Sequence, residues 1–386
     1  MRPGDILIAR AGSVGKSFLI EQAERAVFAS YLIRYRPKVV PRYVHYWLQT
    51  DAYWSQIVDN TAGIAVPNVN ASKLDRISIP IPEPDIQRRI VERIDELFSE
   101  LDDGEEELRR ARAELETYRK SLLKAAVTGD LTADWRAGNP GQESAERLRE
   151  RIVVDRRSRW DAEPRNKGKK YKPPADGRTA LEITLPEGWI WASLDQVCER
   201  ITDGTHQPPK FVSEGVPFLV IRNVVGGKIN WPSVGKWVSR DTYLRETARL
   251  RPSKGDVLYT AVGSYGVALE VAEDREFMFQ RHIAHLRPLP SAIHQRFLAY
   301  VLNSSLGRRQ ADLAARGVAQ KTVTLGDLAR FAIPVPPNAE QQVICSRLAD
   351  VDQSGPLSSE CQEIHGISQI LRQSILAAAF RGDLVQ

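Results

Sequence analysis

The chain has little cysteine: Cys198, Cys345 and Cys361 are the only three among 386 residues. They are far apart, odd in number and not in Cys-x-x-Cys spacing, which argues against a disulfide framework and a cysteine-based zinc site. No run of about 18 apolar residues occurs, so the sequence offers no membrane span. The N-terminus MRPGDILIAR lacks the apolar segment of a secretory signal peptide. We therefore expect a cytoplasmic protein.

Catalytic and cofactor motifs are missing as well. The segment from Gly12 to Ser17 (GSVGKS) ends like a phosphate-binding loop, but Arg10 stands where that loop needs its first glycine. There is no HExxH, no GxSxG, no GxGxxG after a strand, and no Asp/Asn-Pro-Pro-aromatic loop of amino-methyltransferases. The six histidines are scattered, and the spacing of His282 and His285 suits opposite faces of a strand rather than joint metal ligation. We predict no catalytic centre and no metal site.

The composition that is present is ordinary for a globular protein. Apolar residues make up 42 % and charged residues 27 % of the chain, and the length suits two or three domains. The net charge of +5, from 54 Lys and Arg against 49 Asp and Glu, permits a polyanionic partner without demonstrating one.

The clearest feature is an internal repeat with a period near 250 residues. Residues 4–15 (GDILIARAGSVG) match 255–266 (GDVLYTAVGSYG), and the IPIP of 79–82 matches the IPVP of 333–336. Residues 121–131 (SLLKAAVTGDL) match 374–384 (SILAAAFRGDL). In each copy the pattern predicts short strands around glycine turns, then helical pieces, an extended proline segment and a long helix.

The first long helix carries an apolar residue in five successive heptads. These residues are Ile94, Leu101, Leu108, Leu115 and Leu122. This seam predicts a coiled-coil helix over residues 85–127, roughly 60 Å long. The second copy is weaker: its seam is Ile364, Leu371 and Ile375, Ser368 interrupts it, and Gly355-Pro356 should break the helix. Mutual pairing of the two helices is favoured over a solvated bundle face.

Between the repeats lies a basic central region. Residues 144–160 have a helical pattern, and residues 165–176 (RNKGKKYKPPAD) contain proline and suggest flexibility. Residues 146–172 hold 11 Lys and Arg against 5 Asp and Glu. A solvated linker and a segment that tracks phosphates remain equal alternatives.

Two similar modules suit a ligand with two sites at fixed spacing, and duplex DNA is such a ligand. The loops carry side chains that could read base edges or hold phosphates, although each of them, taken singly, is more often a solvated surface residue. The DNA-binding candidates are Arg10, Ser13, Lys16 and Asn68 in the first copy, and Thr205, His206, Lys210, Arg222, Asn223, Ser264, Tyr265, Arg281, Gln320, Lys321 and Thr322 in the second.

These segments together resemble one family. The order LPEGWIWASL, TDGTHQPPKF, FLVIRN, KGDVLYTAVGSYG, RHIAHLRP, GVAQKTVTLGDLARFAIPVPP and LRQSILAAAFRGDL is similar to the specificity subunit of type I restriction–modification systems. The resemblance covers essentially the whole chain. It implies an α+β protein with two α/β-type target recognition domains, separated by long helices that pair as an antiparallel coiled coil.

The resemblance also implies a division of labour. The chain would be a non-catalytic subunit that reads a bipartite site in double-stranded DNA and uses its helices as a ruler. It would dock two methyltransferase subunits, and restriction/translocase subunits could join. This chain would carry no cofactor, because S-adenosylmethionine, ATP and Mg would sit on the partner subunits. The alternatives are a stand-alone DNA-modifying enzyme and a coiled-coil scaffold without DNA function.

One departure from the family concerns the first recognition domain. Residues 185–251 of the second copy have no counterpart in the first. A misassigned start codon, a truncated product and a piece supplied by another chain would each explain this, and the first two are favoured. The expected organisation is a partial first recognition domain (1–84), a spacer helix (85–127), a central linker region (128–184), the second recognition domain (185–338) and a second spacer helix region (339–386).

Overall fold

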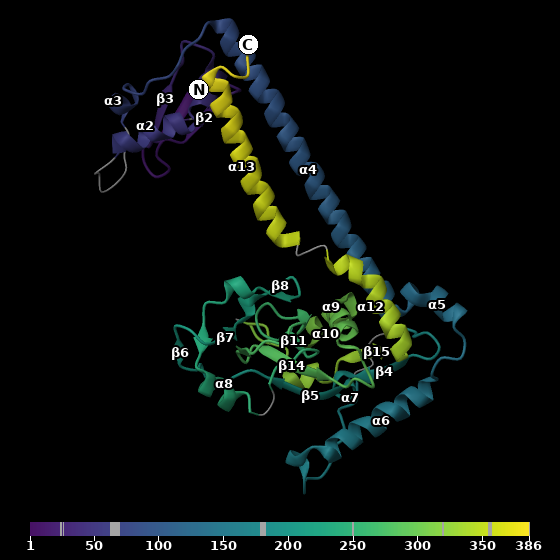
Figure 1. The fold of residues 1–386 in the computed structure, drawn as a ribbon. Coiled ribbons are helices and arrows are strands. Elements are labelled where there is room, and N and C mark those ends of the chain that lie inside the picture. Colours follow the sequence, from purple (N-terminus) through teal and green to yellow (C-terminus); the bar gives the residue numbers. More distant parts are fainter. Residues whose placement is uncertain are drawn as a thin grey trace. The chain divides into compact units, whose positions relative to one another are not determined.

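The computed structural model describes residues 1–23, 25, 27–61, 70–177, 183–248, 251–318, 320–353 and 357–385. Within these, the side chains of 59–61, 350–353 and 357–365 are not described. The chain divides into a first unit, Met1–Arg112 with Ser359–Gln386, and a second unit, Ala113–Ser358. The division falls inside the long helix α4 (Pro84–Thr128), blue in Figure 1.

The first unit is a small antiparallel sheet with helices. Its strands are β1 (Ile6–Ala9), β2 (Ser17–Leu19) and β3 (Leu32–Tyr35), and its short helices are α1 (Pro41–Trp47), α2 (Asp51–Thr61) and α3 (Ala71–Leu74). The sheet order is β2-β1-β3. The first part of α4 and most of α13 (Leu357–Arg381) complete this unit.

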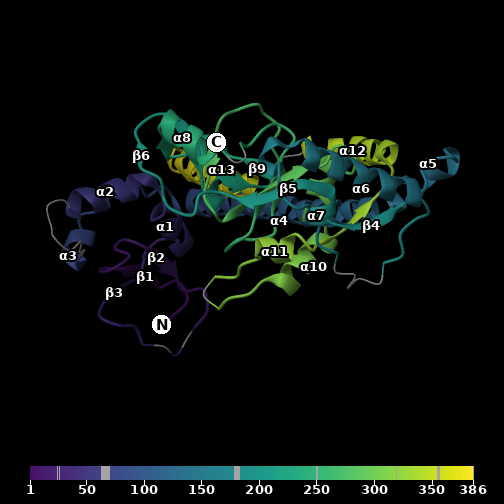
Figure 2. The ribbon, with the colours of Figure 1, turned by 90° about the horizontal axis from the view of Figure 1, so that it is seen from below.

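The second unit contains the central region and a larger mixed fold. Its helices are α5 (Ala133–Gly138), α6 (Ala145–Ala162), α7 (Leu194–Val197), α8 (Arg240–Glu246), α9 (Gln295–Asn303), α10 (Ser305–Ala314), α11 (Leu325–Leu328) and α12 (Asn338–Gln353), with 3-10 turns η1 (Asp130–Thr132), η2 (Pro164–Asn166), η3 (Ile221–Asn223) and η4 (Trp231–Ser233). Helix α6 begins where the pattern predicts, because the Ser144 side chain accepts a hydrogen bond from the Arg147 N–H. It lies beside α7 and β4 (Figure 2).

Several small sheets form the body of the second unit. The strands are β4 (Ile190–Ser193), β5 (Cys198–Asp203), β6 (Phe211–Val212), β7 (Val216–Leu219), β8 (Val224–Val225), β9 (Lys228–Ile229), β10 (Trp237–Val238), β11 (Val257–Thr260), β12 (Ala268–Glu270), β13 (Met278–Phe279), β14 (Ile283–Pro288) and β15 (Ala332–Val335). Their orders are β12-β11-β14-β5, β13-β7-β10-β6, β15-β4 and β8-β9. The free thiols of Cys198 and Cys345 are buried, and the Cys361 side chain lies outside the described ones.

The structure confirms the repeat down to strand register. Ile6 pairs with Leu19 and with Tyr35, and 251 residues later Val257 pairs with Glu270 and with Leu286. The two copies also share an ion pair that joins adjacent strands. The Arg36 Nε–Asp5 Oδ1 and Arg287 Nε–Asp256 Oδ1 distances are both 2.9 Å.

A second shared device fixes the start of each long helix. The Gln87 side chain donates to the Pro82 carbonyl and accepts from the Val40 N–H. Gln341 does the same with the Pro336 carbonyl and the His294 N–H. Both glutamines are 1 % exposed, so each holds the proline segment and the following helix against the rest of its unit.

The glycine motif that ends like a phosphate-binding loop is a turn between strands. Gly12 and Gly15 have φ of 73° and 86°, and their counterparts Gly263 and Gly266 have φ of 72° and 93°. These left-handed conformations favour glycine. A strand, β2, starts at Ser17, whereas a phosphate-binding loop opens into a helix.

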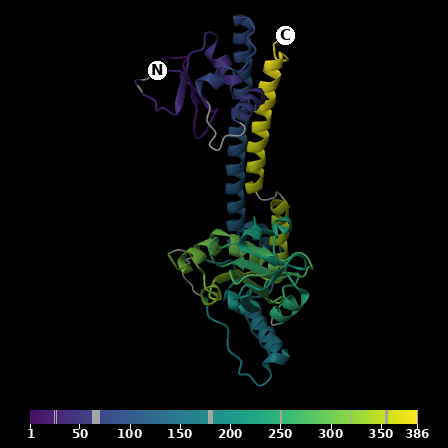
Figure 3. The same ribbon diagram turned by 90° about the vertical axis from the view of Figure 1, so that its left-hand side faces the viewer.

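Helices α4 and α13 pair antiparallel within the first unit (Figures 1 and 3). Ile90 and Ile94 of α4 share a buried cluster with Leu376 and Ala379 of α13. Asp102, about two turns beyond Ile94 along α4, bonds to Arg372, which lies earlier in α13 than Leu376. The direction therefore agrees with the expected antiparallel coiled coil.

The seam itself differs in part from the predicted one. Ile94 is fully buried, Leu101, Leu115, Leu122 and Ile375 are half-buried, and Leu108 is 52 % exposed. Leu371 is 43 % exposed, because α13 also packs on α1 and turns Leu376 and Ala379 inward instead. The side chain of Ile364, in α13, is not among the described ones, and the predicted break at Gly355-Pro356 lies outside the described residues.

The buried carboxylate of Asp256 makes the stability of the second unit depend on pH. Burial alone would raise the pKa of Asp256, but hydrogen bonds from Arg287 and His285 lower it to about 2. The unfolded value is about 3.9. A depressed pKa contributes stability that is present above about pH 4 and is lost as the pH falls toward 2. We expect Asp256→Asn to remove about 2–3 kcal/mol of this acid-sensitive stability.

Urea unfolding at a series of pH values, from about 2 to about 7, measures this effect, because this range spans the folded and the unfolded pKa of Asp256. The unfolding free energy of the parent protein should fall more steeply between about pH 4 and 2 than that of the variant. Asp241→Asn, at an exposed position of α8, serves as the control. Equal slopes for the parent and Asp256→Asn would contradict the assignment.

Candidate nucleic-acid interface

Three loops that are distant in sequence meet at one end of the β11–β14 sheet. The Ala261 N–H donates to the His282 carbonyl, and the Gly263 N–H donates to the Lys321 carbonyl, each at 2.9 Å. The Val323 N–H donates back to the Ala261 carbonyl at 2.9 Å. These main-chain bonds hold the loops in place without using any side chain. Their polar side chains stay available to a ligand.

The loops line a hollow of about 410 Å³. Its lining residues are Val220, Ile221, Arg222, Lys236, Val262, Gly263, Ser264, Gln280, His282 and Gln320. The set has two fixed cations and no carboxylate, and both glutamines offer a donor and an acceptor. Such a surface favours an anionic ligand that also presents hydrogen-bonding edges.

The hollow unites three predicted contact residues, Arg222, Ser264 and Gln320. Sequence reasoning missed Lys236 and Gln280 and treated His282 as a core or surface residue. No motif marks these residues, because strand pairing between distant segments brings them together. The isolated bridge between Thr205 and Gln280 is one such pairing.

Other predicted residues lie near these loops but outside the lining. His206, Lys210, Arg281 and Lys321 are exposed. His206 Nε2 lies 3.3 Å from Asp203 Oδ2. The main chain of Thr205 bonds to Phe279 and Arg281, and that of Thr322 bonds to Arg316.

Asn223 and Tyr265 have structural partners instead. Asn223 is 1 % exposed; its amide donates to Ser233 and accepts from the Val220 N–H. Tyr265 is 7 % exposed, and its hydroxyl donates to Asp312 at 2.8 Å. Their polar groups are already used inside the protein, so we remove both from the proposed contacts.

The first unit has a related but smaller polar site. Ser13, which aligns with Ser264, lines a hollow of about 370 Å³ together with Lys16 and Trp54. Arg10 is half-buried and is not among its lining residues. Asn68 lies outside the described residues.

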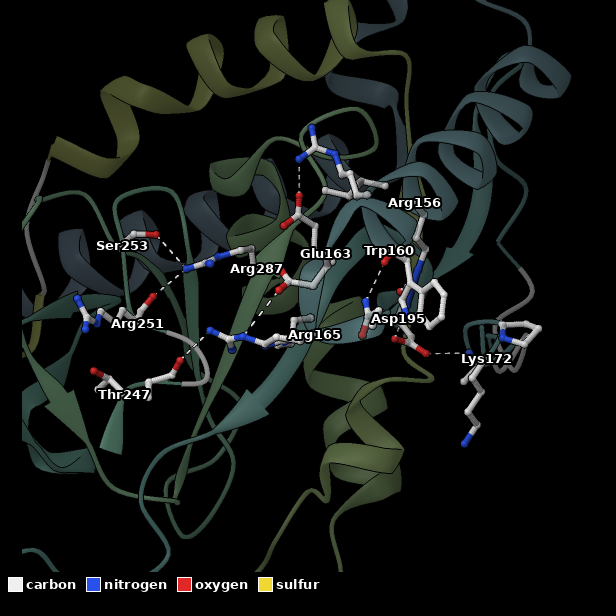
Figure 4. A pocket seen from close by; sticks show the side chains of 18 of the residues that line it. Arg156, Trp160, Glu163, Arg165, Lys172, Asp195, Thr247, Arg251, Ser253 and Arg287 are labelled. Atoms are coloured by element: carbon white, nitrogen blue, oxygen red, sulfur yellow. Dashed lines mark hydrogen bonds and ion pairs between the residues drawn. The ribbon is translucent and has the colours of Figure 1, made fainter. Parts of the chain in front are cut away.

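A larger hollow of about 1040 Å³ lies at the opposite end of the second unit's sheet (Figure 4). Arginines dominate it, but several are engaged within the protein. Arg156 lies 3.0 Å from Asp195, and Arg287 pairs with Asp256 and Ser253. Arg165 donates to the Ala248 carbonyl at 2.9 Å. Arg156 and Arg165 of the basic central region thus contact α7 and the segment after α8, which favours a structural role over phosphate tracking for these two residues.

The part of the chain that the structure describes offers neither a metal-binding cluster nor a membrane-spanning helix. Among those residues no three His, Cys, Asp or Glu side chains gather as a metal site would require. None of the described helices combines the length and apolarity needed to cross a membrane.

Known proteins with similar sequences and folds share one description. Residues 2–110 and 187–363 match the family model of the type I restriction modification DNA specificity domain. The type I restriction enzyme EcoBI specificity subunit of Escherichia coli is 26 % identical over 337 residues, covering 86 % of this chain. This chain spans only 64 % of that relative.

Two solved structures have the same fold. One comes from work on complex assembly and conformational transition of the type I R-M system. It superposes with a TM-score of 0.64 at 21 % sequence identity, and the match covers 99 % of this chain and 83 % of that one. The other is the HsdS subunit from Thermoanaerobacter tengcongensis. It superposes with a TM-score of 0.56 at 20 % sequence identity, and the match covers 99 % of this chain and 82 % of that one. With the family model matching more than half of its residues, the chain belongs to the family of type I restriction modification DNA specificity domains.

Proposed function

We propose that this chain is the sequence-reading subunit of a type I restriction–modification complex. The observation that carries the proposal is the hollow that joins Arg222, Ser264 and Gln320. Arginine can bond bidentately to the O6 and N7 of guanine, and glutamine to the N6 and N7 of adenine. The hollow therefore pairs cations for phosphates with side chains that distinguish bases.

The first unit would read the other half of a bipartite target. Ser13 occupies the repeat position of Ser264, and Lys16 lies beside it. The paired long helices would act as the ruler for the unread spacer. The exposed faces of these helices and the central region would dock two methyltransferase subunits, to which restriction/translocase subunits add.

The chemistry would belong to those partners. S-adenosylmethionine, ATP and Mg would be bound by the methyltransferase and restriction subunits, and this subunit would be non-catalytic. With these partners and DNA, the subunit would work in the cytoplasm. We also propose the domain organisation that the sequence predicts, with a partial first recognition domain at 1–84, spacer helices at 85–127 and 339–386, a linker region at 128–184 and the second recognition domain at 185–338.

The proposal is tested by mapping adenine methylation in cells that express the chain with its methyltransferase subunits. We expect one split motif. Gln320→Ala or Arg222→Ala should relax or abolish one half of it, because a bidentate base contact contributes about 1–3 kcal/mol of discrimination, or roughly 5- to 150-fold. Lys254→Ala, an exposed cation at the opposite end of the sheet, is the matched control. An unchanged motif in both variants would refute the role of this hollow.

A further inference from the structure

The hollow of the candidate interface has two levels, which we call its rim and its floor. The rim is the exposed part of the lining and consists of Arg222, Lys236, Gly263, Ser264 and Gln320. The floor is the half-buried part and consists of Val220, Ile221, Val262, Gln280 and His282. Both fixed cations of the lining lie on the rim, so the floor combines apolar groups with one amide and one imidazole.

The main chain at Gln280 is fixed from both sides. Its N–H donates to the Leu219 carbonyl, and its carbonyl accepts from the Ile283 N–H, each at 3.1 Å. The loop after β5 packs directly on this segment, since a Cβ on Gly204 would collide with the Phe279 carbonyl oxygen. The Gln280 side chain therefore projects from a backbone that is already ordered, which lowers the entropic cost of binding a ligand there.

Two polar side chains of the floor are open to a ligand. Gln280 and His282 are half-buried, and within the part of the chain that the structure describes neither side chain has a hydrogen-bond partner. His285, three residues after His282, differs because its Nε2 lies 2.7 Å from Asp256 Oδ2. A ligand that covers the floor removes water from the amide and the imidazole, and a covered polar group without a partner is destabilising. The ligand therefore has to supply hydrogen-bonding atoms of its own.

The depth of the floor decides which part of a DNA duplex it can meet. Base edges lie at the bottom of a major groove about 8.5 Å deep, so side chains that read them have to project from the protein surface. The exposed Arg222 and Gln320 can project in this way, whereas Gln280 and His282 are recessed. A phosphodiester backbone is the convex, outermost part of the duplex and fits a recess. The two cations of the rim, with no carboxylate in the lining, suit its negative charge.

We propose that the floor receives one phosphodiester of the DNA backbone, and that the Gln280 amide and the His282 imidazole donate hydrogen bonds to its oxygens. Lys236, whose Nζ lies 4.8 Å from the centre of the Phe211 ring, supplies positive charge from the rim. The floor then fixes where the half-site lies on the second unit, while exposed rim residues read the bases. This inference rests on the proposed function and divides its hollow into residues that position DNA and residues that select sequence.

Gln280→Glu and Gln280→Ala test the floor, because the first keeps the size of the side chain and the second removes its amide. Fluorescence anisotropy measures binding of the chain, with its methyltransferase subunits, to a duplex with the mapped methylation motif and to an unrelated duplex. We expect both variants to weaken both complexes by the same factor, about 10- to 100-fold, since a hydrogen bond to a charged group is lost. The methylation motif should stay unchanged. Gln142→Ala, at an exposed position of the central region, is the control.

A salt series separates the floor from the rim. Lys236→Ala should lower the slope of log affinity against log salt concentration by about 0.9, because a lysine that contacts phosphate displaces counterions. Gln280→Ala should weaken binding without changing this slope, because the amide carries no charge.

A changed base in the motif of either Gln280 variant would overturn the proposal, because the amide would then read a base; glutamate would in that case favour cytosine. Binding at the parent level in both variants, or a loss confined to the target duplex, would overturn it as well. The proposed function fails on a different result, an unchanged motif in both Arg222→Ala and Gln320→Ala. The two failures are therefore distinguishable.

Discussion

Glu340→Ala is expected to lower the free energy of unfolding of the second unit by about 3–5 kcal/mol, because breaking a buried ion pair leaves an uncompensated charge. Glu340 is 1 % exposed at the start of α12. It accepts hydrogen bonds from Thr132, Arg136 and the Trp189 indole N–H. These donors come from the turn after α4, from α5 and from the residue before β4. One carboxylate therefore joins three segments of the second unit.

Urea unfolding followed by hydrogen-exchange mass spectrometry measures the loss and assigns it to peptides of the second unit. Asp134→Ala is the matched control, because the Asp134–Arg347 pair joins the same two helices, α5 and α12, at an exposed position. It should shift the unfolding midpoint little. Equal shifts for the buried and the exposed pair would contradict the structural role of Glu340.

Leu108→Pro is expected to break α4 near its middle. Proline removes the N–H that bonds to the carbonyl of Gly104 and clashes with it, at a cost of about 3 kcal/mol or more. If the long helix carries the methyltransferase subunits, the variant should lose copurification with them and lose adenine methylation in cells. Circular dichroism should show a loss of helix while the units stay folded.

Leu108→Ala distinguishes the effect of breaking the helix backbone from the effect of losing the Leu108 side chain. Since Leu108 is 52 % exposed, truncation should change stability by well under the proline cost, about 1 kcal/mol or less. Complexes and methylation should persist in this variant. Methylation at the parent level in Leu108→Pro would rule out a continuous α4 as a requirement for assembly.

The sequence predicted most of what depends on local pattern. The strands at residues 6–9 and 257–260, the glycine turns after them and the helix over 85–127 all appear, because periodicity and glycine act over a few residues. The repeat also predicted that the two copies would share a design. Matching registers and the matching Asp–Arg pairs confirm it.

The remaining features depend on pairing between strands that are distant in sequence, which local patterns do not predict. Lys236, Gln280 and His282 join the candidate interface only because distant strands pair. Asn223 and Tyr265 look like surface polar residues in sequence, but Ser233 and Asp312 engage them inside the fold. In α13 the inward face follows the double contact with α1 and α4, which a heptad pattern for two helices alone does not include.

The buried glutamines that hold the start of each long helix, Gln87 and Gln341, bear on how the recognition loops can evolve. Gln341 and its partners lie away from the loops that carry Ser264 and Gln320, and main-chain bonds hold those loops. Substitutions in the loops therefore leave the helix anchor untouched. A lineage could acquire a new target preference through a few surface exchanges while keeping its assembly intact, and the duplicated anchor would let either half change independently.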